Sequence, residues 1–234
     1  MNPAPLNAVS ALAPHLPGDD RKLRADGAAT RTRLLDAVVQ CILEHGYYQA
    51  SSNAIARQAG VTWGTIQHQF GTRQGLLLAV LESRWRRLTQ RIEAADVRGD
   101  TLEERLACVM AVLETHYGDP EHLVITQIML DLVQSPDTTD AVKRAVTEHG
   151  RELTRVWQPL FTQAMGQAAG DEELVLFAFQ AIRGYLSANT MAGRMGPPRH
   201  HARVRSLLLR GVACAIREQA AAAGRDAGDP QRPL

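Results

Sequence analysis

The chain has 234 residues, of which 45% are hydrophobic, and a formal net charge of +1. This length allows one or two domains with a sizeable core, and the absence of any run of 18 apolar residues excludes a transmembrane helix of the usual length. The first twenty residues contain no Lys or Arg, so they do not form the charged start of a secretory signal. Three widely spaced cysteines, Cys41, Cys108 and Cys214, show no CxxC pattern and are typical of buried thiols in a reducing compartment. We therefore expect a cytoplasmic protein with no membrane partner.

The small net charge conceals an uneven distribution. Residues 21–92 contain 11 Lys or Arg and 4 Asp or Glu, whereas residues 93–234 contain 15 and 19. A basic first third joined to a mildly acidic remainder is typical of a DNA-binding head on a body that does not bind DNA. A solvated basic face without a nucleic-acid partner is the alternative.

The first helix is predicted over residues 30–44, where apolar residues recur at offsets of three and four. His45 and Gly46 end it. The Pro-rich and Gly-rich residues 1–25 before it are predicted to be a disordered extension. Basic residues near the end of this extension, Lys22 and Arg24 among them, could follow the minor groove beside a DNA-reading helix and add salt-dependent affinity.

Residues 51–70, SSNAIARQAGVTWGTIQHQF, predict two short helices joined by a tight turn. Ser51 or Ser52 can cap the first helix, and Gly60 can adopt the positive φ that a helix end often requires. Thr62 can cap the second helix, with Val61, Ile66 and Phe70 on its buried side. The second helix would then expose a polar face for base edges and phosphates, comprising Trp63, Thr65, Gln67, His68 and Gln69. This is the layout of a helix-turn-helix motif, although similar helix pairs occur in all-α domains that bind nothing.

The remaining residues predict a series of amphipathic helices and no strands. Thr72 can cap a fourth helix that continues toward Ile92, and Thr101 with Glu104 forms a capping-box pattern. The apolar segment 123–133 is expected to be buried, and a helix over 139–168 is expected to kink or break near Trp157 because it contains Pro159. Two long helices follow, at about 171–192 and 198–223, and a disordered tail is predicted over 224–234.

The N-terminal pattern resembles the tetracycline-repressor (TetR) family of bacterial transcription regulators. The resemblance covers roughly residues 30–82 and is carried by a series of short motifs in matching order and spacing. These are Leu35-Asp36-Ala37, Gly46-Tyr47, the run from Ile55 to Val61, Gly64-Thr65-Ile66, His68, Phe70, and Arg73 followed by Leu76-Leu77. The implied fold is all-α, with a three-helix helix-turn-helix domain over 26–72 and a helical effector-binding and dimerisation domain over 73–223.

The resemblance implies that the helix-turn-helix unit contacts DNA, with Arg73 as a candidate phosphate clamp. The candidate DNA-binding residues are Ser51, Ser52, Asn53, Thr62, Trp63, Gly64, Thr65, Gln67, His68, Gln69, Arg73, Lys22 and Arg24. Two of them depart from the family pattern, which usually has a basic or polar residue in place of Trp63 and a tyrosine in place of Gln67. Gln67 or Gln69 could pair with adenine, and Trp63 could contact a thymine methyl group or the backbone, or serve only in packing.

The resemblance also implies that the last two helices form a homodimer interface and that the body binds a small-molecule effector. From the residues alone, the wide apolar faces of these two helices could equally close the core of the monomer. Flexible and aromatic side chains suggest a hydrophobic effector, although ordinary core packing explains each of them as well. The candidate effector-binding residues are Met110, Gln127, Met129, Trp157, Phe161, Met165, Phe177 and Tyr185.

We expect no catalytic activity, cofactor or metal, because the chain contains no nucleophile elbow, phosphate-binding loop or metal-ligand spacing. His116, His122 and His149 lie in different segments, and the neighbouring His200 and His201 side chains would diverge on a helix. The function that this pattern favours is a ligand-responsive regulator, most readily a repressor, that binds a palindromic double-stranded DNA operator as a dimer. The alternative is an effector-independent DNA-binding protein with an architectural or nucleoid-associated role.

Overall fold

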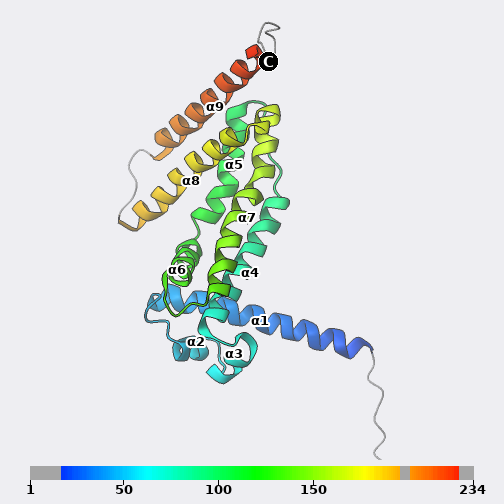
Figure 1. The fold of residues 1–234 in the computed structure, drawn as a ribbon, viewed down its shortest axis with the longest axis vertical. Coiled ribbons are helices and arrows are strands. Elements are labelled where there is room, and N and C mark those ends of the chain that lie inside the picture. The colour runs from blue at the N-terminus through cyan, green and yellow to red at the C-terminus, as the bar shows by residue number, and fades with distance from the viewer. Residues whose placement is uncertain (1–16, 196–200, 227–234) are drawn as a thin grey trace, which may run out of the picture.

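The structure is a computed structural model that describes residues 17–195 and 201–226. Within these ranges the chain forms nine α-helices and one short 3-10 helix, with no strand, which confirms the predicted all-α class. Figure 1 shows an elongated molecule with the first three helices at one end and the last two helices at the other. In the part of the chain that is described, no helix is long and apolar enough to span a membrane.

The N-terminal head consists of three helices and the start of a fourth. Helix α1 spans Pro17–His45, α2 spans Ser52–Gln58, α3 spans Trp63–Phe70 and α4 spans Arg73–Glu93. The long α4 leaves the head and continues into the body, so that it contacts α1 and α3 at one end and α6 and α7 along its length (Figure 1).

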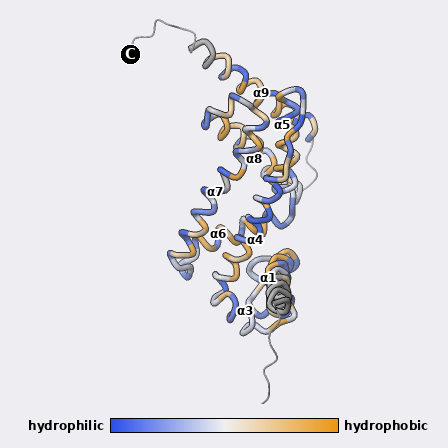
Figure 2. Tube along the Cα trace, turned by 90° about the vertical axis from the view of Figure 1, so that its right-hand side faces the viewer, coloured by the Kyte–Doolittle hydropathy of each residue, from blue (hydrophilic) through white to orange (hydrophobic). Residues whose placement is uncertain are grey.

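The body contains the other elements. Helix α5 spans Leu102–Tyr117, α6 spans Pro120–Gln134 and α7 spans Asp140–Met165, and the 3-10 helix η1 follows at Gly166–Gly170. Helices α8, Glu172–Met195, and α9, His201–Asp226, lie side by side at the far end and pack against α5 (Figure 1). Apolar residues recur along each helix without forming one continuous apolar segment (Figure 2).

Local signals in the sequence explain where the helices begin. The side-chain oxygens of Ser51, Thr62 and Thr72 accept backbone N–H groups at the starts of α2, α3 and α4, as predicted. Thr101 and Glu104 form the predicted reciprocal capping box at the start of α5. Gly60, in the turn between α2 and α3, has a φ of +68°, a conformation that glycine adopts without the strain of a side chain.

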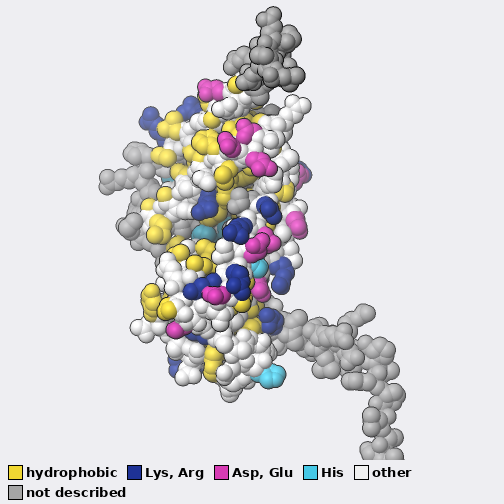
Figure 3. All heavy atoms as spheres, viewed as in Figure 1, with side chains coloured by type: hydrophobic (Ala, Val, Ile, Leu, Met, Phe, Trp, Pro, Cys, Tyr) yellow, Lys and Arg dark blue, Asp and Glu magenta, His cyan; other side chains and the backbone are white. Residues whose placement is uncertain are grey.

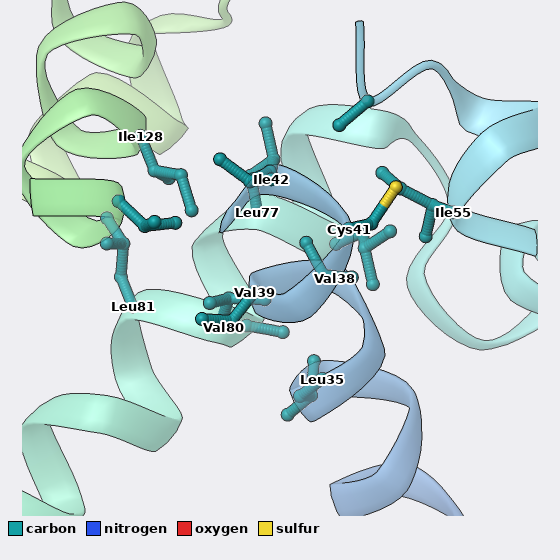
Figure 4. Close-up of a cluster of buried hydrophobic side chains, with 14 of the residues drawn as sticks. Leu35, Val38, Val39, Cys41, Ile42, Ile55, Leu77, Val80, Leu81 and Ile128 are labelled. Atoms are coloured by element: carbon teal, nitrogen blue, oxygen red, sulfur yellow. The ribbon is translucent and has the colours of Figure 1, made fainter. Parts of the chain in front are cut away.

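Two clusters of buried side chains hold the molecule together. The first joins α1, α2 and α3 to the first half of α4 and also includes Ile128 and other residues of α6 (Figure 4). The second fills the body between the end of α4, α5, α7, α8 and α9. The predicted domain division after residue 72 stays a prediction, and the first cluster runs across that point because α4 and α6 complete the core of the head.

Several elements differ from the sequence expectations. Helix α1 begins at Pro17, so residues 17–25 are helical where a disordered extension was predicted, while residues 1–16 and 227–234 lie outside the described residues. Helix α7 contains Pro159 and continues through it without a break, from Asp140 to Met165. Helix α6 is only half buried, since Leu130 and Val133 face outward.

Cys41 is buried, but Cys108 is partly exposed and Cys214 is exposed, so the expectation of three buried thiols was wrong.

Candidate nucleic-acid interface and effector site

Helix α3 presents the polar face that the sequence predicted. Gly64, Thr65, Gln67, His68 and Gln69 are exposed, whereas Ile66 is fully buried and fixes the helix to the head. The Thr65 hydroxyl lies 2.9 Å from the Thr62 hydroxyl, which orients both side chains at the start of the helix. Hydrogen-bonding side chains on one rigid, capped helix can read base edges in the major groove.

Trp63 differs from its neighbours on α3. The sequence pattern predicts it on the exposed face, but the structure shows it half buried and packed against the first core cluster. Its indole therefore anchors the first turn of α3 to the head. This position supports the packing alternative, because a side chain held against the core has less freedom to reach a base.

The remaining predicted DNA contacts have mixed surroundings. Ser51 and Asn53 are exposed at the start of α2, and Ser52 is half buried. Lys22 and Arg24 lie on the first turns of α1, but their side chains are outside the described residues. A predicted contact by these two residues therefore stays a prediction.

Arg73 has a structural role that the sequence did not reveal. Its Nη1 donates to the Ala50 carbonyl oxygen over 2.7 Å, and its guanidinium carbon lies 5.8 Å from the centre of the Tyr47 ring. These contacts fix the start of α4 against the loop between α1 and α2. A guanidinium has five N–H donors, so the hydrogen bond to Ala50 leaves others for a phosphate.

Two polar connections join the head to the body. The Tyr47 hydroxyl donates to Asp131 of α6 over 2.6 Å, and burial together with this carboxylate raises the pKa of Tyr47. Arg84 of α4 is 9% exposed, and it contacts Asp36 of α1 and Glu121 of α6, each at 2.8 Å. If either carboxylate moved away, the buried Arg84 guanidinium would lose part of the negative charge that neutralises it, which is costly inside a protein. These ion pairs therefore couple the positions of α1, α4 and α6.

Sequence reasoning missed this junction, because nothing in the local pattern distinguishes Arg84 from the exposed Arg86 two residues later. Figure 3 shows basic and acidic side chains intermixed over the middle of the molecule, where the head meets the body. The only available signal was the spacing of Arg84, Arg87 and Arg91, which places them on one side of α4.

The eight residues predicted to bind an effector do not form one site. Trp157 and Phe161 line a groove of about 390 Å³ between α7 and α8, together with Val175, Leu176 and Phe179. Met110 and Met165 are buried in the second core cluster, and the Tyr185 hydroxyl contacts His201. Gln127, Met129 and Phe177 do not line this groove, and their predicted contact with an effector stays a prediction. Gln127 and Phe177 are exposed, and Met129 packs against the first cluster.

An aromatic cluster that the sequence did not predict lies beside the groove. The short connection between α5 and α6 brings His116 and His122 together, with ring centres 4.8 Å apart, and both rings approach Tyr117. Trp157 continues the cluster from α7, and its ring centre lies 5.9 Å from that of His116. Burial lowers the pKa of His116 to about 3, and the neighbouring His122 and Arg91 add to the effect. His149, by contrast, is stacked on Trp85.

Residues 34–80 match the model of a family described as "Bacterial regulatory proteins, tetR family". Over residues 34–80 the chain thus matches the TetR family. The "Fatty acid metabolism regulator protein" of Bacillus subtilis is 31% identical over 102 residues, which cover 42% of this chain and 51% of that protein. The "HTH-type transcriptional regulator BetI" of Brucella anthropi is 35% identical over 82 residues, or 35% of this chain and 42% of that protein. The chain thus spans about half the length of the curated relatives that it matches.

Solved structures extend the TetR likeness to the body, as a likeness of fold. The transcriptional regulator FadR from Bacillus subtilis, solved in complex with stearoyl-CoA, has a TM-score of 0.55 and 21% identity, covering 79% of this chain and 96% of that one. A TetR transcription regulator from Haloarcula marismortui has a TM-score of 0.59 and 18% identity, covering 80% and 98%. The predicted TetR-type architecture, a helix-turn-helix head on a helical body, is therefore confirmed.

Proposed function

We propose that this chain is a ligand-responsive transcriptional repressor that binds a palindromic operator as a homodimer. The observation that carries the proposal is the capped and rigid α3, which exposes a row of hydrogen-bonding side chains within a TetR-type head. Two such helices related by a twofold axis would reach successive major grooves about 34–36 Å apart. Palindromic half-sites would then mirror the symmetry of the dimer.

The test is selection of bound fragments from random double-stranded DNA by the full chain. We expect one palindrome to be enriched. The variant Gln67→Ala should then lose discrimination at an A·T pair of each half-site, by about tenfold, because a good bidentate contact contributes about 1–3 kcal/mol. Gln90→Ala is the matched control, since Gln90 is an exposed glutamine on α4 outside the head.

Two results would contradict different parts of this proposal. Failure to enrich any palindrome would contradict dimeric operator binding. Full base discrimination by Gln67→Ala would contradict the adenine contact alone, and the same variant at Gln69 would then be the next candidate.

The dimer is proposed to form through α8 and α9. One side of each helix closes the second core cluster, with Ile182 and Val212 buried, whereas the other side exposes Phe177 of α8 and Leu207 of α9. The mid-helix Gly184 and Gly211 have open space where a side chain would begin. An unpaired apolar face with mid-helix glycines, which cost helix stability in a monomer, is readily explained by a second copy packing closely against it.

The proposed effector is an apolar molecule that binds in the groove between α7 and α8. The groove is lined mainly by Phe161, Phe179 and other apolar side chains, and Trp157 at its wall is only 1% exposed. The Trp157 indole N–H is buried without a hydrogen-bond partner among the described residues, so it could donate to a carbonyl or other acceptor of the ligand. This groove favours an effector-responsive role over the architectural alternative.

Stearoyl-CoA is a suitable first probe, because it is the ligand named for the FadR structure. We expect it to release the selected operator, and Trp157→Phe should require about tenfold more of it, since the aromatic ring is kept while the N–H donor is lost. Release at the same concentration by the variant would contradict the role of the indole. An operator complex that no apolar ligand releases would favour the architectural alternative.

A further inference from the structure

A second cavity lies where α4, α5 and α6 meet, and it shares no lining residue with the α7–α8 groove. It has a volume of about 120 Å³, which equals the space of about four water molecules at ~30 Å³ each. Arg84, Arg87 and Arg91 line it from α4, and His116 and His122 line it from α5 and α6. A cavity of this size in contact with three guanidinium groups can hold one small anionic group.

Each carboxylate around this cavity already has a partner inside the protein through at least one oxygen atom. Glu121 contacts Arg84, and Asp119 accepts the Glu121 backbone N–H over 2.9 Å. Asp36, on α1, forms ion pairs with both Arg84 and Arg87. Asp36 and Glu121 are therefore committed to arginines inside the protein, and Asp119 uses one oxygen atom to cap the start of α6.

The unengaged groups at the cavity are nitrogen atoms. Arg91 has no hydrogen-bond or ion-pair partner among the side chains that the structure describes. His122 Nδ1 is buried without a partner, and a neutral imidazole can donate from one of its nitrogens. A group that satisfies these atoms must accept hydrogen bonds, and the positive charge of Arg91 favours an acceptor that is negatively charged.

We propose that the cavity between α4, α5 and α6 binds an oxyanionic group, a phosphate or a carboxylate, between Arg91 and His122. The bound oxygen atoms accept from the Arg91 guanidinium and from His122 Nδ1. Arg84 and Arg87 stand at the same wall, so the anion also competes with Asp36 for them. Because Asp36 belongs to α1, this competition alters the connection between the head and the body, a consequence that rests on the proposed function.

The test uses sulfate as the probe, since its charge is constant between about pH 6 and 8. Isothermal titration of the full chain at constant ionic strength, without DNA, should show saturable binding at low millimolar sulfate, below the range where sulfate acts as an excluded salt. Arg91→Gln should weaken this binding about tenfold, because one charge-assisted contact is lost. Arg86→Gln is the matched control on the same helix, and both arginines are exposed, so neither variant disturbs the core.

A second arm identifies the source of the anion. Octyl phosphate is titrated in parallel with sulfate, with octanol as the uncharged control. Binding of octyl phosphate more than about tenfold tighter than sulfate, with the same loss in Arg91→Gln, assigns the anion to the end of a larger apolar ligand. Equal affinities assign a free anion.

An independent readout follows the ring of His122. Its Nδ1 resonance, measured in ¹⁵N-labelled protein, should shift as sulfate saturates the site, and in Arg91→Gln the same shift should need about tenfold more sulfate. The proposal is overturned if neither probe binds saturably, or if Arg86→Gln loses as much affinity as Arg91→Gln. These results do not depend on DNA, so they are distinguishable from a failure of the proposed repressor function.

Discussion

His116 and His122 show how burial determines the chemistry of single residues in this protein. Both rings lie in the aromatic cluster, and burial lowers the pKa of each, that of His116 to about 3. In the unfolded chain a histidine has a pKa near 6.5. Below about pH 6.5 the unfolded state therefore binds more protons than the folded state, and the free energy of unfolding falls as the pH falls.

The first prediction concerns this acid sensitivity. Between about pH 6 and 4.5 the free energy of unfolding should lose up to about 1.4 kcal/mol per pH unit through His116, and the lowered pKa of His122 adds a loss in the same direction. His116→Asn should remove one such contribution and flatten the slope, whatever its effect on stability at pH 8. Denaturant unfolding at several pH values measures the slope. His68→Asn is the matched control because it removes an exposed imidazole, and an unchanged slope in His116→Asn would contradict the buried neutral state.

At the scale of elements, the junction between α3 and α4 fixes the DNA-reading helix to the helix that enters the body. Gly75, in the first turn of α4, has no room for a side chain, since an added Cβ would lie 2.2 Å from the Phe70 carbonyl oxygen. Gly64 in α3 differs, because its added Cβ would meet only the Thr62 hydroxyl oxygen, at 3.7 Å. The close approach of α4 to the end of α3 therefore requires glycine at position 75, whereas position 64 has room for a side chain.

The second prediction follows from this pair of glycines. Gly75→Ala should lower the free energy of unfolding by about 1–3 kcal/mol, because the backbone must shift to relieve the contact. Gly64→Ala should leave it unchanged or raise it by about 0.5–1 kcal/mol, because alanine favours helix. Thermal or denaturant unfolding of both variants measures the difference. Equal stability of the two variants would mean that the junction yields more easily than the structure indicates.

At the scale of the whole molecule, the head and body form a continuous unit. An exposed apolar face on α8 and α9 lies at the end far from the head. The head shares its core with α4 and α6, and Arg84 joins α1 to both. A ligand that shifts α4 or α6 in the body can therefore change the position of the head, provided that it binds the two positions with different affinity. Helices α8 and α9 lie at the opposite end from the head (Figure 1), and both carry exposed apolar side chains.

The third prediction tests the proposed dimer. Leu207→Glu on α9 should shift the protein from dimer to monomer, because a charge would be buried in an apolar interface, and operator affinity should fall with it. Sedimentation velocity measures the oligomeric state. Leu130→Glu on α6 is the matched control, since Leu130 is 49% exposed and Leu207 is 51% exposed. A monomeric wild-type chain, or dissociation in both variants, would contradict an interface through α8 and α9.

The sequence by itself determined where α2, α3 and α4 begin, because their signals are local. Ser51, Thr62 and Thr72 cap helices through backbone N–H groups three residues away, and Gly60 takes its positive φ in the turn that it occupies. The exposed row on α3 follows from the same local periodicity. These features need no knowledge of the rest of the molecule.

Tertiary structure decided which side chains meet and which are buried. The sequence could not place Trp63 against the core, separate Met129 from Trp157, or bring His116 and His122 into one cluster. It also could not distinguish Arg84, held between two carboxylates, from the exposed Arg86 on the same helix. The physical reason is that helical periodicity specifies the direction of each side chain around its own axis, whereas contacts and burial depend on the neighbouring helices, whose packing involves residues distant in sequence.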